Sequence, residues 1–229
     1  MATFILIPGA GGDAFYWTFV IPELAKRGHT AIGVDLPGED ESAGLQEYTD
    51  LAVKAAAGHD DLVVVGQSLG GFTAPLVSGR VDAKLLILVN PMIPRPGETA
   101  GEWWGNTGQG EAYAKKAVEV GQDPEAEFDL HAGFFHDVSP EVTERAFENG
   151  ASPEADVVFG QPWPLKAWPD VPTKVLLGRD DRLFPLEFQR RNVQERLGIT
   201  PDEMPGGHLV AFSQPEGLAA RLDSYWQAL

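Results

Sequence analysis

Cysteine is absent from this chain of 229 residues, and basic residues are scarce. Without cysteine there can be no disulfide bond, no thiolate nucleophile and no cysteine-ligated metal site. The 17 lysines and arginines stand against 34 aspartates and glutamates, which gives a formal net charge of −17. Nucleic acid and anionic membranes repel such an acidic surface, so we expect neither as a partner.

Long apolar runs are missing as well. No stretch approaches the roughly 20 apolar residues that a membrane-spanning helix requires. Residues 1–7 lack the basic region and the length of a secretory signal, so we expect a cytoplasmic protein. Hydrophobic residues nevertheless make up 43% of the chain, which is enough to build the core of one sizeable α/β domain.

Short apolar runs, each ending in turn residues, recur along the chain. They predict strands at Phe4–Ile7, Thr30–Val34, Leu62–Val65, Leu85–Val89 and Lys174–Leu177, with a weaker one at Ile199–Met204. Near-continuous apolarity is typical of parallel strands that are buried on both faces. The predicted helices fall between and after these strands, at Val20–Arg27, Tyr48–Ala57, Leu69–Gly79, Leu186–Leu197 and Leu218–Leu229. This alternation predicts a doubly wound α/β fold with a mostly parallel sheet.

The alternation stops between Pro91 and Pro172, where no convincing strand is found. Asp123, Ser139 and Ser152 each precede a Pro-Glu pair in this stretch. A capping side chain followed by proline and a carboxylate is typical of a helix N-terminus. We therefore expect a helical cap inserted at 94–168, within a core formed by 1–93 and 169–229.

One pentapeptide, Gly66-Gln67-Ser68-Leu69-Gly70, stands between a predicted strand and a predicted helix. A serine in such a strand-to-helix turn exposes its hydroxyl, and the flanking glycines allow the backbone to turn tightly. The motif in this setting predicts a nucleophile elbow with Ser68 as nucleophile. The alternative is an ordinary glycine-rich loop, which would need no partner residues elsewhere.

A serine nucleophile needs a histidine base and a carboxylate that orients the base. His208 follows Pro205-Gly206-Gly207 at the end of the last predicted strand, where catalytic groups of open α/β sheets gather. His29 and His59 precede strands and are expected at the surface. Asp180 and Asp181 both follow the strand Lys174–Leu177, and on position alone either one could orient His208.

The negative charge that develops on an attacked carbonyl oxygen requires backbone N–H donors. We expect one donor at Leu69, directly after the nucleophile. The second is expected in the glycine-rich loop after the first strand, at Ala10, with Gly11 as the alternative. A dinucleotide-binding loop is disfavoured, because Gly9, Gly11 and Gly12 do not form the G-x-G-x-x-G pattern.

Taken together, these residues resemble the α/β-hydrolase superfamily over essentially the whole chain. The resemblance is greatest to the small capped esterases grouped with plant methylesterases and hydroxynitrile lyases. It is carried by Ile7-Pro8-Gly9-Ala10-Gly11, Phe15-Tyr16-Trp17, Val34-Asp35-Leu36-Pro37-Gly38, Gly66-Gln67-Ser68-Leu69-Gly70-Gly71, Phe135-His136-Asp137-Val138-Ser139-Pro140-Glu141, the Asp181-x-x-x-Pro185 segment and Gly206-Gly207-His208. The family spacing G-x-x-D-x-x-x-P implies Asp181 rather than Asp180 as the orienting acid.

Two departures from the family pattern narrow the expected activity. Pro8 stands where the family often has histidine. The hydroxynitrile lyases have a threonine and a lysine where this chain has Gly9 and Leu209, so cyanohydrin cleavage is disfavoured. The resemblance implies a serine hydrolase that cleaves a small carboxylic ester with Ser68, His208 and Asp181. The alternatives are a receptor-like protein that binds a ligand with little turnover, and a carbon–carbon hydrolase or perhydrolase on the same residues.

Aromatic residues crowd the predicted cap and the first loop. They suit a pocket for an apolar ester, although they would equally form local cores. The candidate pocket residues are Tyr16, Trp17, Trp103, Trp104, Phe135 and Trp163. The chemistry implies no cofactor and no metal. The expected partner is a small-molecule ester, bound by a monomer or a homodimer.

Overall fold

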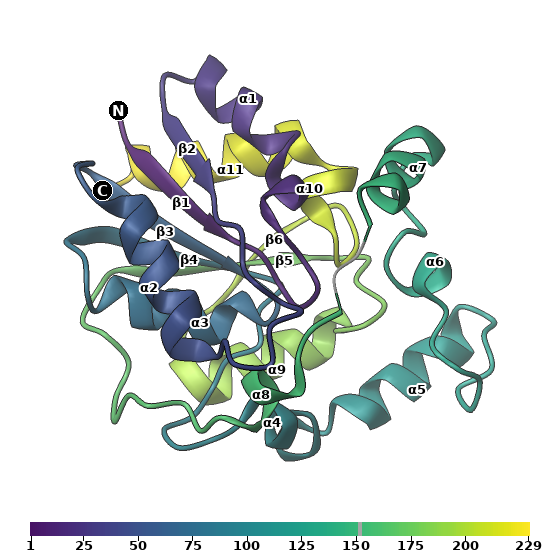
Figure 1. The fold of residues 1–229 in the computed structure, drawn as a ribbon. Coiled ribbons are helices and arrows are strands. Elements are labelled where there is room, and N and C mark those ends of the chain that lie inside the picture. Colours follow the sequence, from purple (N-terminus) through teal and green to yellow (C-terminus); the bar gives the residue numbers. More distant parts are fainter. Residues whose placement is uncertain (151–152) are drawn as a thin grey trace.

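The computed structural model describes residues 1–150 and 153–229. Within them the strands form one six-stranded sheet in the order β2-β1-β3-β4-β5-β6, in which all neighbouring strands are parallel (Figure 1). The predicted α/β fold is therefore confirmed. The strands are β1 (Thr3–Ile7), β2 (Thr30–Gly33), β3 (Leu62–Gln67), β4 (Ala83–Val89), β5 (Thr173–Gly178) and β6 (Asp202–Met204).

Helices cover both faces of the sheet because alternate side chains of each strand point to opposite sides. Phe4 and Leu6 of β1 pack with α1 (Val20–Lys26) and α11 (Pro215–Gln227). Ile5 and Ile7 pack with the helices on the other face. Those helices are α2 (Leu45–Ala56), α3 (Gly70–Ser78) and α9 (Leu186–Leu197). Two short helices, η1 (Ala14–Trp17) and α10 (Val210–Ser213), follow β1 and β6.

The chain between β4 and β5 carries the remaining helices of the described residues. These are α4 (Ala100–Thr107), α5 (Gln109–Glu119), α6 (Leu130–Gly133), α7 (Pro140–Asn149) and α8 (Asp156–Gly160). In Figure 1, α5, α6 and α7 lie at the right, away from the two chain ends. Trp103 of α4 and Val158 of α8 share an apolar cluster with Phe72 of α3, so part of the insertion packs onto the core. The division into a core and a separate cap at 94–168 stays a prediction.

The three expected helix starts in the insertion have different outcomes. Ser139 caps α7 as expected, because its hydroxyl accepts the Val142 N–H. Asp123 accepts the Glu125 N–H, but the segment forms only a turn, so a helix there is a wrong prediction. Ser152 lies outside the described residues, and the next helix begins at Asp156.

The strand order changes direction between the neighbouring strands β1 and β3. From β1 the chain moves outward to β2, and it then returns to the other side of β1 to form β3. Loops that leave adjacent strands in opposite directions open a crevice at the carboxyl edge, where α/β proteins bind ligands. The loop after β1 and the turn carrying Ser68 border this crevice.

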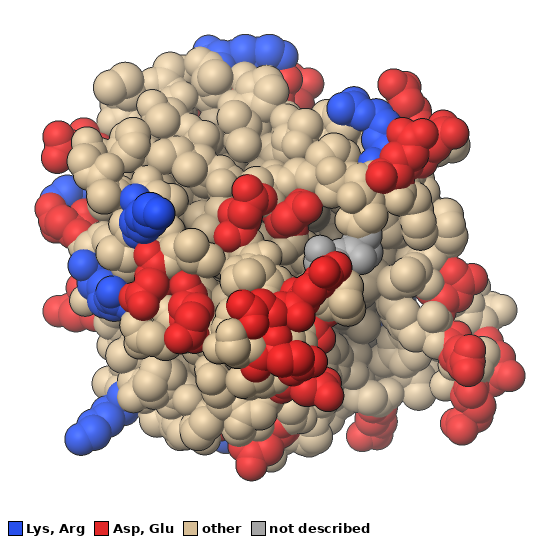
Figure 2. All heavy atoms as spheres, viewed as in Figure 1, with Lys and Arg blue, Asp and Glu red and all other residues tan. Residues whose placement is uncertain are grey.

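Acidic residues outnumber basic ones, 34 to 17, in the sequence. Figure 2 shows acidic side chains gathered near the middle of one face, with basic side chains scattered toward its outline. Among the residues that the structure describes, no helix is long and apolar enough to cross a membrane.

Candidate functional site

Ser68 lies in a tight turn directly after β3. Its φ is 51°, in the left-handed region that serine adopts only under local constraint. The flanking glycines permit this turn through close packing. A Cβ at Gly66 would lie 2.5 Å from the Gly70 carbonyl oxygen, and a Cβ at Gly70 would lie 2.7 Å from that of Pro8. The geometry is the one expected for a serine in the turn between a strand and a helix.

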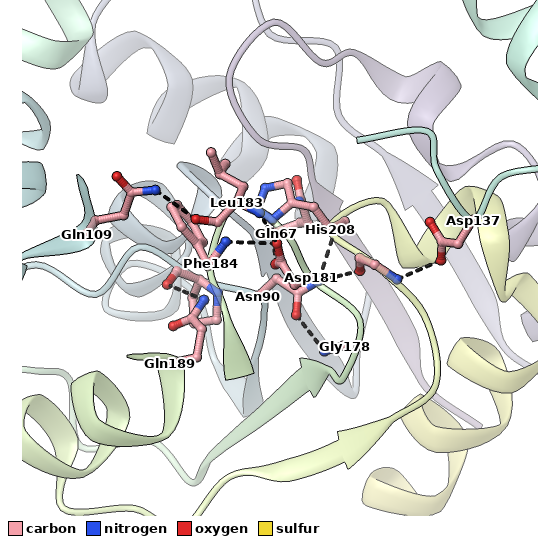
Figure 3. Close-up of polar contacts among 12 residues, drawn as sticks. Gln67, Asn90, Gln109, Asp137, Gly178, Asp181, Leu183, Phe184, Gln189 and His208 are labelled. Atoms are coloured by element: carbon pink, nitrogen blue, oxygen red, sulfur yellow. Dashed lines mark hydrogen bonds and ion pairs between the residues drawn. The ribbon is translucent and has the colours of Figure 1, made fainter. Parts of the chain in front are cut away.

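His208 reaches the same edge from the loop between β6 and α10. Its Nδ1 lies 2.7 Å from Asp181 Oδ2, and the exposed fractions of the two residues are 2% and 1%. Asp181 Oδ1 accepts the N–H groups of Leu183 and Phe184, at 2.9 Å and 2.8 Å (Figure 3). A carboxylate held by two backbone donors keeps the His208 proton on Nδ1 and leaves Nε2 free to accept a proton.

The neighbouring acid, Asp180, has a different partner. It is exposed, and its Oδ2 accepts the Gly206 N–H at 3.0 Å. Its own N–H donates to the Gly206 carbonyl at 3.0 Å. On sequence position alone, either aspartate could orient His208. In the structure Asp181 contacts His208, whereas Asp180 bonds to the backbone of Gly206 in the loop that carries His208.

Two aromatic rings enclose the imidazole of His208. Phe134, at the end of α6 in the insertion, is stacked on it with ring centroids 5.2 Å apart. Phe184 meets it edge-on at 5.0 Å. These contacts restrict rotation of the ring, and they reduce the access of water to its bond with Asp181.

Asn90 joins the ends of two strands to the loop that carries His208. Its Nδ2 donates to the Gly207 carbonyl at 3.0 Å and to the His208 carbonyl at 3.1 Å (Figure 3). Its Oδ1 accepts the Gly178 N–H at 2.7 Å. Gln67, beside Ser68, adds a bond from Nε2 to the His208 carbonyl at 3.2 Å. Sequence reasoning missed both roles; the only signal at Asn90 is an amide directly after a buried strand.

The loop after β1 lies against the serine turn. A Cβ at Gly9 would come within 2.8 Å of Ser68 Cβ, so only glycine allows this approach. Ala10 and Leu69, the two expected oxyanion donors, line the same cavity as Ser68, and their role stays a prediction. Gly11, the alternative donor, already gives its N–H to Glu154 Oε2 at 2.8 Å. Ala10 is thus the better placed of the two.

Ser68 and His208 open into one cavity of about 570 Å³. Its walls are mainly aromatic and include Phe15, Phe128, Phe134, Phe147, Phe159 and Phe212, with the carboxylates of Asp13 and Glu154 among the polar groups. Within the described lining there is no lysine or arginine.

Three of the six expected pocket residues line the cavity, and three do not. Tyr16, Trp104 and Phe135 lie on its wall. The prediction is wrong for Trp17, Trp103 and Trp163, which belong to the buried core. The side chains of this second group are almost completely buried in apolar clusters: Trp17 on the α1 and α11 face, and Trp103 and Trp163 with α3 and α9. Aromatic composition alone does not distinguish a pocket wall from the core behind it.

Burial raises the pKa of Tyr16 far above its usual range, against a smaller opposing effect of the Ala211 N–H. Tyr16 therefore stays a neutral phenol on the cavity wall.

The location of His29 differs from the expectation. It is buried rather than at the surface, with Nδ1 accepting the Ala2 N–H and Nε2 2.9 Å from Asp223. That pair lies at the opposite edge of the sheet and has a structural role.

A family comparison agrees with this architecture. The sequence profile of the Alpha/beta hydrolase family matches residues 4–221, and the chain belongs to that family. Among curated relatives, the Probable esterase PIR7A of Oryza sativa subsp. indica is 34% identical over 96 residues. Norfluorocurarine synthase 1 of Strychnos nux-vomica is 32% identical over 96 residues. Each match spans 38% of this chain and only 36% of the relative's length.

Solved structures match over nearly the full chain. Polyneuridine aldehyde esterase has a TM-score of 0.77 at 20% identity, covering 98% of this chain and 99% of that one. The methylesterase MES16 from Arabidopsis has a TM-score of 0.76 at 17% identity, covering both chains completely. A pyrethroid hydrolase from Sphingobium faniae JZ-2 has a TM-score of 0.74 at 20% identity over 99% of this chain and 98% of that one. At these identities the likeness establishes the fold alone.

Proposed function

We propose that this protein is a serine hydrolase that cleaves a small carboxylic ester through an acyl-enzyme. The observation that carries the proposal is the convergence of two features on one apolar cavity. One is a serine in a left-handed turn at a helix start, and the other is a buried histidine bonded to a buried carboxylate. The esterase names of a rice relative and of two structural neighbours support the same class.

The proposed mechanism follows from the positions of these groups. Ser68 Oγ attacks the ester carbonyl while His208 Nε2 takes the hydroxyl proton. Asp181 stabilises the imidazolium that forms, and the Ala10 and Leu69 N–H groups stabilise the tetrahedral oxyanion. His208 then returns the proton to the leaving alcohol. A water molecule, activated by the same imidazole, attacks the acyl-enzyme and releases the acid and Ser68.

Proton transfer requires Ser68 Oγ and His208 Nε2 to approach within hydrogen-bonding distance. The described residues show both on one cavity wall without a bond between them. In free hydrolases this contact is often long and shortens when substrate binds.

The insertion supplies the substrate pocket in this proposal. Residues 94–168 act as a cap, and Trp104 and Phe135 contribute cavity wall from it. The aromatic lining favours esters with apolar acyl or alcohol groups. The carboxylate of Asp13 on the cavity wall disfavours ester substrates that also carry an ionised carboxylate.

Hydrolysis of p-nitrophenyl esters of increasing acyl length tests the proposal. Wild type is expected to turn over, and Ser68→Ala is expected to lose the activity. Ser78→Ala is the matched control, because Ser78 is a buried serine of the adjoining helix whose hydroxyl bonds to the Ala74 carbonyl. A fluorophosphonate should label wild type and Ser78→Ala at Ser68 only.

Two results would contradict the proposed function. Activity that survives Ser68→Ala would exclude Ser68 as the nucleophile. Tight binding of apolar esters without turnover would instead indicate a receptor-like protein on this fold. A perhydrolase or carbon–carbon hydrolase would be recognised by faster turnover with hydrogen peroxide as acyl acceptor or with a diketone as substrate.

A further inference from the structure

Glu154 connects the insertion to the loop that follows β1. It lies between α7 and α8 and contributes to the cavity wall. One carboxylate oxygen accepts the Gly11 N–H at 2.8 Å, and the other accepts the Tyr48 hydroxyl of α2 at 2.6 Å. The next residue, Ala155, donates its N–H to the Gly38 carbonyl at 2.7 Å. The segment is thus fixed to the core at several points around Glu154.

The loop itself is a tight turn whose orientation depends on few bonds. Gly12 N–H donates to the Gly9 carbonyl at 3.1 Å, and Gly11 has a φ of 65°. A glycine-rich turn of this kind has many accessible conformations when nothing outside it holds its backbone. The bond from Gly11 to Glu154 is an external restraint one residue beyond Ala10.

We propose that Glu154 is a positioning residue for oxyanion stabilisation. By accepting the Gly11 N–H, it orients the loop so that the Ala10 N–H faces the carbonyl attacked by Ser68. The inference rests on the proposed function, because it assigns a role to Glu154 in the same reaction. Tyr48 fixes the carboxyl group from the opposite side and so acts one step further away.

The role requires a hydrogen-bond acceptor rather than a negative charge. A full charge beside the oxyanion would oppose the transition state, and burial raises the pKa of Glu154, although the Tyr48 and Gly11 hydrogen bonds act in the other direction. Glutamine can keep both contacts. Its carbonyl oxygen can accept the Gly11 N–H, and its amide can donate to the Tyr48 oxygen.

The test compares Glu154→Ala, Glu154→Gln and wild type on the best p-nitrophenyl ester. We expect Glu154→Ala to lower kcat by about 10- to 100-fold, since removal of one oxyanion donor costs about 10²–10³ and misplacement costs less. KM should change by less than about twofold, because the loss falls on the transition state. Glu154→Gln should retain most of kcat. Asp156→Ala, an exposed acid two residues along the chain, is the matched control.

A trifluoromethyl ketone that forms a tetrahedral adduct provides a second readout. Its inhibition constant should rise in Glu154→Ala in proportion to the loss of kcat, whereas the affinity for the product alcohol should stay the same. A purely structural contact would alter thermal unfolding and leave the ratio of these two affinities unchanged.

The outcomes separate this inference from the proposed function. Turnover by wild type with Ser68 labelled, together with an unchanged kcat in Glu154→Ala, would overturn the inference alone. An equal loss in Glu154→Gln and Glu154→Ala, with both variants folded by circular dichroism, would also overturn it, because acceptance of a hydrogen bond would not be the cause. Absence of ester turnover by wild type would overturn the proposed function and the inference with it.

Discussion

Replacement of Asp181 by asparagine tests the orientation of His208 most directly. The carboxylate accepts three N–H groups: one from His208 Nδ1 and two from the Leu183 and Phe184 backbone. Asparagine has almost the same shape but carries one acceptor oxygen and one donor amide. If its oxygen keeps the two fixed backbone donors, its amide must face the imidazole.

The amide then reverses the hydrogen bond to His208. Nδ1 becomes the acceptor, so the ring proton moves to Nε2, and Nε2 is no longer able to take the proton of Ser68. The same exchange in a serine protease lowers kcat by about 10⁴, or about 5 kcal/mol in the activation barrier. Because Asp181 is 1% exposed, water has little access to replace the lost acceptor. We expect a loss of the same order here.

Steady-state hydrolysis of the preferred p-nitrophenyl ester provides the measurement, with Asp180→Asn as the matched control. Asp180 is exposed and accepts only the Gly206 N–H with its side chain, a bond that the asparagine oxygen can keep, so the loss should be below about threefold. Thermal unfolding would establish that both variants are folded. A folded Asp181→Asn that keeps a tenth or more of wild-type kcat, or a larger loss in Asp180→Asn, would refute the reasoning.

Two other predictions concern stability and loop position. Glu98 and Arg196 form a buried ion pair between the insertion and α9, so Glu98→Gln should lower the free energy of unfolding by about 3 kcal/mol in urea titrations. Burial alone would raise the pKa of Glu98, but hydrogen bonds, first that from Arg196, hold this pKa below its ordinary value. A lowered folded-state pKa contributes stability above the unfolded value, so the difference between wild type and variant should shrink as pH falls below about 4.5. Asn90→Ala removes three buried hydrogen bonds and should lower the free energy of unfolding by about 3 kcal/mol in the same titration. It should also lower kcat by about tenfold or more. An unchanged kcat would show that Asn90 does not position the His208 loop.

Much of the fold was predictable because its signals are local. Buried parallel strands require continuous apolar runs, and each run identified in the sequence corresponds to a strand of the sheet. The positions of Ser68, Asp181 and His208 were also predictable, because each follows a strand and the carboxyl ends of parallel strands share one edge. Their proximity is therefore a consequence of topology.

The residues that sequence reasoning missed act over long separations. Asn90 bonds to the His208 loop, which lies more than a hundred residues away in the sequence. Glu154 bonds to the loop after β1 over a similarly long sequence separation. No local pattern encodes such pairs, because packing of the whole domain decides which polar atoms become neighbours. The misassigned tryptophans have the same cause: Trp103 faces the core and Trp104 the cavity, although they are adjacent in the sequence.

Contacts from the insertion suggest that it does more than enclose the substrate. Asp137 accepts the Gly207 N–H at 2.6 Å, directly beside His208, and Phe134 is stacked on the imidazole itself. With the Glu154 contact, the insertion therefore touches His208, its loop and the loop after β1, as well as contributing to the cavity wall. A lid that only bound substrate would affect mainly KM. Under the proposed function, these contacts fix the positions of groups that act in the transition state. Substitutions at Asp137, Phe134 and Glu154 should therefore lower mainly kcat. Substitutions at cavity-wall residues without such contacts should instead change mainly KM.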